Sequence, residues 1–486
     1  MVEEEGGIEV LGSPMLVDED EATPLLATDS TTDLLLPINP SSDLGKQLIK
    51  TRRVEASVPS SMLNLTNSIV GVGILSIPYS YKLSGVFPGL FFTFFVWMAS
   101  SYSFQVLGIL SERTACFTYK GIALFTWGRF VALVGELAIL LYTYLSLIAR
   151  PMILSDYTVA ILSNWVDKDS VLLKDWFIIL IVTVVCLLPL ASLPNIDALR
   201  FSSFFSLVCV IFSLGVVVLR FFQTFHWDAA ELKKQFLHME PFNWQLDMFM
   251  SFGLLIVSFT AHFNLPLIYG ELKNRSTRKI NTVIYSSSTL CLFLYTTMGL
   301  FGYMTFLNDT KDNILNNYGG GSHDVPVLIA RIALCLAIIF SYPLTSFACR
   351  NAIMVIFFFE SKFSWIRYFA VTILIVGSTS LLAFVLPNIR AIFGFSGAIF
   401  GVCFVFFLPG LFYLRLPDEE PTLAKPTKTI NGSSQVLVEE AGYVALHRQA
   451  NWKSLRRKIG AWFLMITGVV LGVMGTIGSI INLKDT

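Results

Sequence analysis

Charged residues are scarce in this sequence. Only 14% of its 486 residues are Asp, Glu, Lys or Arg, whereas an ordinary soluble domain carries about 25%. Hydrophobic residues make up 54% of the chain, and its mean hydropathy is +0.67. The 34 basic and 34 acidic residues balance, so the net charge does not favour a nucleic-acid partner. We therefore expect an all-α protein that crosses a membrane many times.

Histidine and cysteine are also few, and their placement excludes several classes of protein. The five histidines are scattered, without the His and Cys spacing of a metal site. No paired carboxylates mark a catalytic site, so we do not expect an enzyme. No charged or carbonyl filter motif indicates a channel. Six of the seven cysteines lie in apolar runs and Cys116 lies in a predicted cytoplasmic loop, so no disulfide framework is expected.

Long apolar runs dominate the chain. A helix needs about 20 mostly apolar residues to cross a bilayer. Lys and Arg gather at alternate ends of the runs, and cytoplasmic loops retain positive charge. We therefore expect about eleven transmembrane helices, a cytoplasmic N-terminus and a C-terminus that is lumenal or extracellular. The runs span approximately 61–81, 85–109, 131–162, 175–193, 201–222, 247–268, 281–306, 326–358, 366–386, 391–413 and 459–482.

Polar segments divide the chain into four parts. Residues 1–55 are acidic and lack apolar periodicity, which predicts a disordered cytoplasmic tail. Residues 56–414 hold the first ten predicted helices. Residues 415–455 are polar and contain three prolines, which predicts a cytoplasmic linker. Residues 456–486 carry the eleventh helix and a short non-cytoplasmic C-terminus.

Two short motifs bear on the cellular location. Glu21, Leu25 and Leu26 resemble the acidic dileucine signal that sorting adaptors read on proteins bound for endosomes and lysosomes, although a chance Leu-Leu pair is the alternative. Asn308 begins a glycosylation sequon in a predicted non-cytoplasmic loop. We favour an endolysosomal or vacuolar membrane, with the plasma membrane as the alternative.

The first apolar run is interrupted at its centre. The stretch NSIVGVGILSIP, residues 67–78, contains two glycines and a proline. In hydrocarbon an unsatisfied backbone group costs several kcal/mol, so such a break survives only where it is buried in protein or lines a cavity. Amides freed after the break suit a carboxylate, and carbonyls freed before it suit a small cation. Gly71, Val72 and Gly73 are therefore expected to line a site, although close packing of small residues is the alternative.

The sixth apolar run is interrupted as well. It reads SFGLLIVSFTAHFNLPLIYGEL, with polar residues and Pro266 in its middle. Transporters built from inverted repeats place their binding site between two discontinuous helices at corresponding positions of the two halves. Runs one and six hold those positions in a five-plus-five repeat. We therefore expect the two breaks to form one site.

Three stretches resemble the amino acid/auxin permease family, and in particular its sodium-coupled neutral amino acid transporters. They are NLTNSIVGVGILSIPYSYKLSG, SFTAHFNLPLIYGEL and IIFSYPLTSFACRNAI, from the first, sixth and eighth runs. In the eighth run, Pro343 is followed seven residues later by Arg350, as in the family. Ala261 stands where the family has cysteine. Helix order agrees along about residues 55–482.

The resemblance implies the LeuT-type fold of the amino acid/polyamine/organocation superfamily and transport by alternating access. By position, residues 71–73 match the family's unwound segment that binds the substrate carboxylate. Ser258, Phe259 and Thr260 would line the opposite wall of the site, with Phe259 as a gate or side-chain contact.

The resemblance also implies a cation site. Asn67 and Ser341 match the family's sodium-site side chains in helices one and eight, although the family often has Thr in place of Ser341. Relatives on vacuoles and lysosomes use protons or no tight coupling. Na⁺ and H⁺ therefore both remain candidate coupling ions, and no other cofactor is expected.

Ionisable residues inside apolar runs are further candidates. An Arg at a helix centre costs about 2.5–3.5 kcal/mol, so it normally faces a partner or a cavity. Arg150 is a candidate gate, with Glu136 and Asp156 on its own helix as candidate partners, whereas Arg350 could extend to the cytoplasm. His262 titrates near neutral pH and is a candidate pH sensor, with a structural role as the alternative.

These features predict a carrier of small neutral or polar amino acids, with the lipid bilayer, the amino acid and sorting adaptors as its partners. The alternative is a sensor that binds an amino acid, transports little of it and signals through its N-terminal tail. Both proteins would use the same pocket.

Overall fold

The computed structural model describes residues 56–163, 165–167, 169–193, 200–224, 239–319, 324–358, 364–386, 389–416 and 452–484. The predicted tail, its motif at Glu21, Leu25 and Leu26, and most of the 415–455 linker lie outside these residues. Within the described ranges the regular elements are helical, which confirms the all-α prediction.

Helices cover each of the eleven predicted runs. Nine described segments are long and apolar enough to cross a membrane, a bent pair can supply a tenth, and Asp175–Ala191 is a shorter apolar segment. In chain order the principal elements are α2 (Val58–Ile69), η2 (Val72–Ser76), α3 (Ile77–Ser84), α4 (Val86–Thr114), α5 (Tyr119–Trp127), α6 (Arg129–Leu162), α7 (Asp175–Val182), η4 (Thr183–Leu187), α8 (Leu188–Ala191), α9 (Arg200–Thr224), η6 (Leu246–Phe249), α11 (Met250–Phe259), η7 (His262–Asn264), α12 (Leu265–Glu271), α13 (Thr277–Phe306), α14 (Val325–Phe357), α15 (Trp365–Val385), α16 (Ile389–Phe395), η10 (Ser396–Gly401), η11 (Cys403–Phe407), α17 (Leu408–Leu414) and α18 (Trp452–Lys484). Short 3-10 turns η3 (Val171–Leu173), η8 (Leu307–Asp309) and η9 (Ile314–Asn317) lie in the connections.

Helix α5 is the element that the sequence pattern did not predict. It lies in a segment that we expected to be a cytoplasmic loop. The helix was not predicted because its nine residues are too few to give a clear apolar period. The Thr118 hydroxyl caps its first turn by accepting a hydrogen bond from the Gly121 amide. Gly128 ends it with φ of 82°, a conformation that favours glycine.

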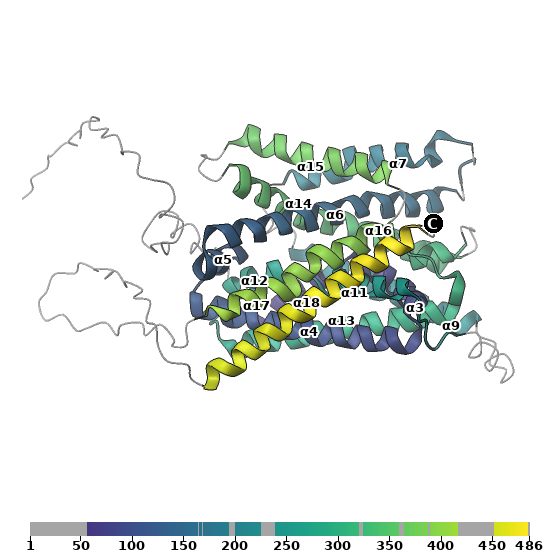
Figure 1. Cartoon of the computed structure of the whole chain (residues 1–486). Coiled ribbons are helices and arrows are strands. Elements are labelled where there is room, and N and C mark those ends of the chain that lie inside the picture. Colours follow the sequence, from purple (N-terminus) through teal and green to yellow (C-terminus); the bar gives the residue numbers. More distant parts are fainter. Residues whose placement is uncertain are drawn as a thin grey trace, which may run out of the picture. The chain divides into compact units, whose positions relative to one another are not determined.

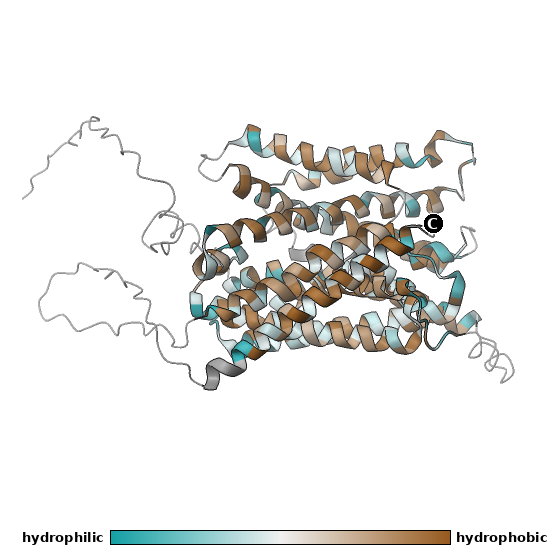
Figure 2. Ribbon diagram, in the orientation of Figure 1, coloured by the Kyte–Doolittle hydropathy of each residue, from teal (hydrophilic) through white to brown (hydrophobic). Residues whose placement is uncertain are grey.

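Helix α11 lies at the centre of the described helices. It packs against α3, α4, α16 and α18, and an 18-residue apolar window of the segment Leu246–Glu271 that contains it is 78% buried, the largest such fraction among the nine spans. Helix α6 runs beside α14, which also packs on α9 (Figure 1). Large apolar side chains are exposed along the outer helices, whose ribbons are largely brown in Figure 2, and a bilayer would cover them.

Glycines bring α11 into close contact with α16 and η10. A Cβ atom added to Gly253 would lie 2.5 Å from the Gly394 carbonyl oxygen, and one added to Gly397 would overlap the Gly253 carbonyl. The two backbones therefore touch, as is common where small residues line a helix crossing in a membrane. This contact fixes the position of α11.

We expect Gly253→Ala to destabilise the protein by about 1–3 kcal/mol, the usual cost of overpacking, because backbone must move. Gly215→Ala on α9 is the matched control: its added Cβ meets nothing within 4 Å, and Ala is favoured over Gly in a helix by about 1 kcal/mol. Thermal unfolding of the detergent-purified variants measures both. Equal midpoints for the two variants would contradict the close contact.

Candidate functional site

Both predicted helix interruptions are confirmed. Helix α2 ends at Ile69, Val70 and Gly71 leave the helical conformation, and the axes of residues 58–69 and 73–84 differ by 49°. Helix α11 ends at Phe259, and Thr260 is extended with ψ of 107° before the chain turns through η7 into α12. Pro78 and Pro266 lie in the first turns of α3 and α12, where the missing amide costs nothing.

The two breaks meet at the side chain of Tyr295 on α13. Its hydroxyl lies 2.9 Å from the Ile69 carbonyl oxygen and 2.6 Å from the Ser258 carbonyl oxygen. These carbonyls lie in the last turns of α2 and α11, where the helices leave such groups without partners. A hydroxyl has one hydrogen, so the two carbonyls share it. The Tyr295 ring also contacts Phe259 edge-on, at 4.8 Å between centroids.

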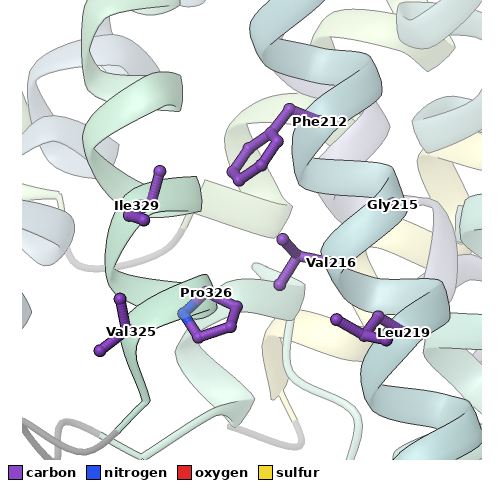
Figure 3. Close-up of a pocket in the computed structure, with 7 residues that line it drawn as sticks. All are labelled: Phe212, Gly215, Val216, Leu219, Val325, Pro326 and Ile329. Carbon is purple, nitrogen blue, oxygen red and sulfur yellow. The ribbon is translucent and has the colours of Figure 1, made fainter.

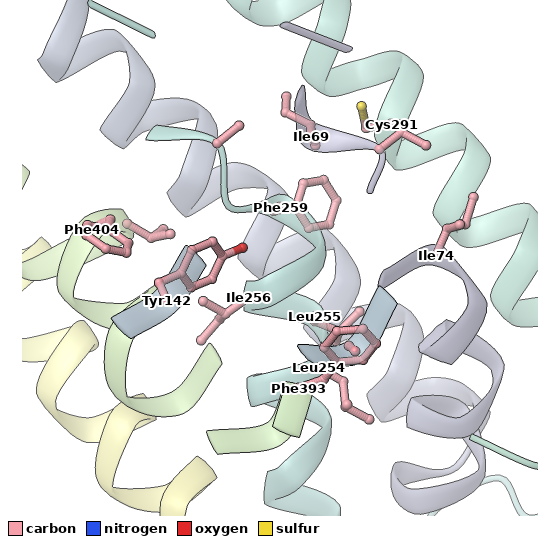
Figure 4. Close-up of a cluster of buried hydrophobic side chains, with 14 of the residues drawn as sticks. Ile69, Ile74, Tyr142, Leu254, Leu255, Ile256, Phe259, Cys291, Phe393 and Phe404 are labelled. Carbon is pink, nitrogen blue, oxygen red and sulfur yellow. The ribbon is translucent and has the colours of Figure 1, made fainter. Parts of the chain in front are cut away.

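A second tyrosine reaches the α11 break from another side. The Tyr142 hydroxyl on α6 donates to the Val257 carbonyl oxygen at 3.3 Å and also interacts with the Thr260 side chain. Figure 4 shows Phe259 between the segment that carries Tyr142 and the one that carries Ile69. Sequence patterns did not single out either tyrosine, because a Tyr in an apolar run looks like any core residue.

The predicted substrate residues come together, but they do different things. Gly71 is exposed, and an added Cβ would meet nothing within 4 Å, so open space reaches the break there. Gly73 instead packs against α11, where a Cβ would lie 2.7 Å from the Ser258 Oγ. Val72 lies between them in the chain. The backbone at Gly71 therefore faces the space that a ligand could enter.

The opposite wall is buried. Ser258, Phe259 and Thr260 are at most 4% exposed. The Ser258 hydroxyl donates to the Leu254 carbonyl, and the Thr260 hydroxyl donates to the Ile256 carbonyl. These side chains thus have their hydrogen atoms engaged within α11, and the polarity of this wall comes mainly from backbone groups.

The two predicted cation ligands each have another partner. The Asn67 amide nitrogen donates to the Ser203 hydroxyl at 3.2 Å. The Ser341 hydroxyl donates to the Ile338 carbonyl at 3.1 Å and accepts from Arg150 Nη1 at 3.0 Å. Within the described residues no hydrogen bond joins Asn67 to Ser341.

The surroundings of Ser341 do not fit a sodium ion in this conformation. Arg150 Nη1 lies 3.0 Å from the oxygen that would bind the ion. Two like charges 4 Å apart repel by about 4 kcal/mol at an effective dielectric constant of about 20. The guanidinium and a sodium ion therefore exclude each other at Ser341.

Arg150 lacks the carboxylate partners proposed for it. It is 6% exposed and donates to the Ser341 and Thr345 hydroxyls. Asp156 instead accepts a hydrogen bond from Asn316, and Glu136 interacts with Lys120. No described carboxylate forms an ion pair with Arg150. The guanidinium is stabilised by hydrogen bonds to neutral hydroxyls, and its positive charge is not neutralised.

Arg350 and His262 are held inside the protein. Arg350 is 2% exposed, donates to the Ala191 carbonyl at 2.9 Å and lies 4.0 Å from the Tyr368 ring, so the alternative that it extends to the cytoplasm is wrong. The His262 ring is fully buried and stacks on Phe104 at 3.8 Å between centroids. This position favours the structural role over pH sensing.

An apolar pocket of about 400 Å³ lies between α9 and α14 (Figure 3). Its lining offers no charged or hydrogen-bonding side chain for an amino acid. The lining residues are Phe212, Gly215, Val216, Leu219, Val325, Pro326 and Ile329.

Comparisons with known proteins agree with this arrangement. The family model for transmembrane amino acid transporter proteins matches residues 55–429. Sodium-coupled neutral amino acid transporter 4 of Homo sapiens is 28% identical over 436 residues, which cover 76% of this chain and 79% of that protein.

Two solved structures share the fold. A Na⁺-coupled sialic acid symporter, in a substrate-bound outward-open state, matches with a TM-score of 0.53 and 13% identity, over 77% of this chain and 83% of its own. MhsT in complex with L-phenylalanine matches with a TM-score of 0.58 and 10% identity, over 88% of this chain and 100% of its own. The predicted LeuT-type fold is therefore confirmed.

We expect Tyr295→Phe to lower the free energy of unfolding by about 1–3 kcal/mol, because the buried Ser258 carbonyl loses its donor and the Ile69 carbonyl keeps only the Gly71 amide. Tyr285→Phe on the same helix is the control, because the Tyr285 hydroxyl donates to Gln105 in an exposed position. Thermal unfolding in detergent measures both. If Tyr295→Phe unfolds at the same temperature as Tyr285→Phe, the hydroxyl does not hold the breaks together.

Proposed function

The chain belongs to the transmembrane amino acid transporter family, and from this premise we propose that it carries small neutral or polar amino acids across a membrane by alternating access. Members of this family are transporters rather than enzymes. The name of the human relative, a neutral amino acid transporter, supports the substrate class.

The main support for transport of amino acids is that the two helix breaks lie together. The backbone at Gly71 faces open space, while the carbonyls of Ile69 and Ser258 converge on Tyr295. An amino acid carries a carboxylate and an ammonium group on one carbon atom. Amides that follow the first break would bind the carboxylate, and carbonyls at the helix ends would accept hydrogen bonds from the ammonium group.

The driving ion is proposed to be a cation. The names of the human relative and of the sialic acid symporter both state sodium coupling, which supports Na⁺, and H⁺ is the alternative. The environment of Ser341 opposes a sodium ion at this residue, because the Arg150 guanidinium already contacts its hydroxyl.

For the membrane we propose a cytoplasmic N-terminus and an endolysosomal or vacuolar location, with the plasma membrane as the alternative. The dileucine-like motif supports the location and suggests sorting adaptors as partners. Basic residues near predicted cytoplasmic helix ends contact aromatic rings, as Arg275 does with Phe117 and Arg415 with Trp127. Such pairs suit either membrane interface, as Lys82 and Arg390 over the Tyr79 ring at the opposite ends show, so the support for the orientation is the placement of Lys and Arg in the sequence.

Uptake of radiolabelled amino acids by the purified protein in liposomes tests the proposal. We expect a neutral amino acid to accumulate or exchange. Gly71→Leu should lower uptake at least ten-fold by filling the open space, while Gly71→Ala should retain most of it, because nothing lies within 4 Å of an added Cβ.

Gly73 variants would be poor controls, since any side chain there meets Ser258. Full uptake by Gly71→Leu would refute the site. Binding of an amino acid without flux in any gradient would instead favour the sensor.

The proposed orientation predicts that Asn308 carries a glycan. Its side chain is exposed, whereas Thr310 of the same sequon is 1% exposed and bonded to the Leu307 carbonyl. Glycosidase treatment should increase the gel mobility of the protein from eukaryotic cells, and Asn308→Gln should abolish that increase. A treatment that leaves the mobility of the wild-type protein unchanged would contradict the orientation.

A further inference from the structure

We infer that the Arg150 guanidinium occupies the Ser341 side of the expected cation site, so that amino acid transport by this protein is independent of sodium. The inference rests on the proposed carrier function and goes against the sodium coupling stated in the relatives' names. It concerns only the sodium ion and leaves coupling to protons open.

The inference that Arg150 excludes sodium rests on the hydrogen bonds of its guanidinium group. Its Nη1 donates to Ser341 Oγ at 3.0 Å, and its Nη2 donates to Thr345 Oγ1 at 2.6 Å. Ser341 and Thr345 are four residues apart on α14 and so lie on one helix face. Because the Ser341 hydroxyl gives its own hydrogen to the Ile338 carbonyl, its oxygen offers a lone pair towards Arg150. A sodium ion bound through the remaining lone pair of this oxygen would lie close to the guanidinium, and the two positive charges would repel each other.

The charge of Arg150 is permanent, because a guanidinium does not lose its proton in proteins. No described carboxylate pairs with it, and the groups that accept its hydrogen bonds are the two hydroxyls of α14. Arg150 thus places one positive charge among neutral oxygens, which is the role a bound sodium ion would have. Because the charge is covalently attached to α6, it cannot be released on the other side of the membrane.

The position of Arg150 connects this charge to the candidate substrate site. Arg150 lies eight residues, about two turns, after Tyr142 on α6. Tyr142 in turn contacts the Val257 carbonyl and Thr260 at the α11 break. Arg150 therefore joins α14 to the same helix, α6, that contacts the α11 break.

The test compares the wild-type chain with Arg150→Ala in two measurements at constant ionic strength. The first is amino acid uptake into liposomes in sodium chloride and in choline chloride. The second is the melting temperature of the purified protein in the same two salts, which does not require transport. For the wild type we expect less than a two-fold change in uptake and no shift in melting temperature. Arg150→Ala exposes the two hydroxyls, and sodium should raise its melting temperature and stimulate its uptake at least five-fold.

Three further variants make the result specific. Arg150→Lys keeps a tethered cation and should remain insensitive to sodium. In the Arg150→Ala background, Ser341→Ala should abolish the sodium effect. Ser346→Ala should preserve it, because Ser346 is a fully buried hydroxyl on the same helix whose oxygen has no hydrogen-bond partner among the described residues.

Two results would overturn the inference. One is a fall of more than five-fold in wild-type uptake when choline replaces sodium, or a sodium-dependent rise in the wild-type melting temperature. The other is an Arg150→Ala variant that stays insensitive to sodium in both measurements. If Arg150→Ala does not fold, the wild type and Arg150→Lys decide the question. An absence of amino acid flux in every salt would refute the carrier function instead, and the melting temperatures would still test Arg150.

Discussion

The rest of the structure depends on how two interrupted helices satisfy their backbone groups away from water. In hydrocarbon an unpaired carbonyl or amide costs several kcal/mol, so a broken helix must find partners within the protein. The Tyr295 hydroxyl supplies one hydrogen to two carbonyls, those of Ile69 and Ser258. The Ile69 carbonyl also accepts from the Gly71 amide, so the shared bond joins the breaks and leaves the Ser258 carbonyl the less satisfied of the two. Backbone groups in that state are suited to accept hydrogen bonds from a charged ligand.

The surrounding helices hold α11 so that its break stays in place. Gly253 brings its backbone against Gly394 and η10, and Tyr142 contacts its last turn from α6. At the end of the broken spans, Ala56 exchanges two backbone hydrogen bonds with Glu271 and Lys273, which joins the start of α2 to the end of α12. The two interrupted helices are therefore linked both at their breaks and at one pair of ends. Motion of one would be transmitted to the other.

Much of the fold could be predicted from the sequence, because hydrophobic length and the positions of Gly and Pro are local properties. They gave the eleven apolar segments and both interruptions, and among the described helices they missed α5 and the short 3-10 turns of the connections. The contacts within the site could not be predicted in this way. Tyr295 and Tyr142 look like ordinary core residues, and the contact between Arg150 and Ser341 joins residues that are distant in the chain. The sequence also could not show that Gly71 faces open space while Gly73 packs against Ser258.

The open space at the first break is proposed to be an amino acid site that is reached from water. A cysteine at Gly71 tests it most directly, through the rate at which a membrane-impermeant maleimide labels it in liposomes. The unsubstituted protein gives the background, which should be low at the loop thiol of Cys116, because burial raises its pKa. We expect the introduced thiol to be labelled, and a transported neutral amino acid to slow the labelling at least five-fold. A thiol that does not react, or that reacts at the same rate with and without amino acids, would contradict the account.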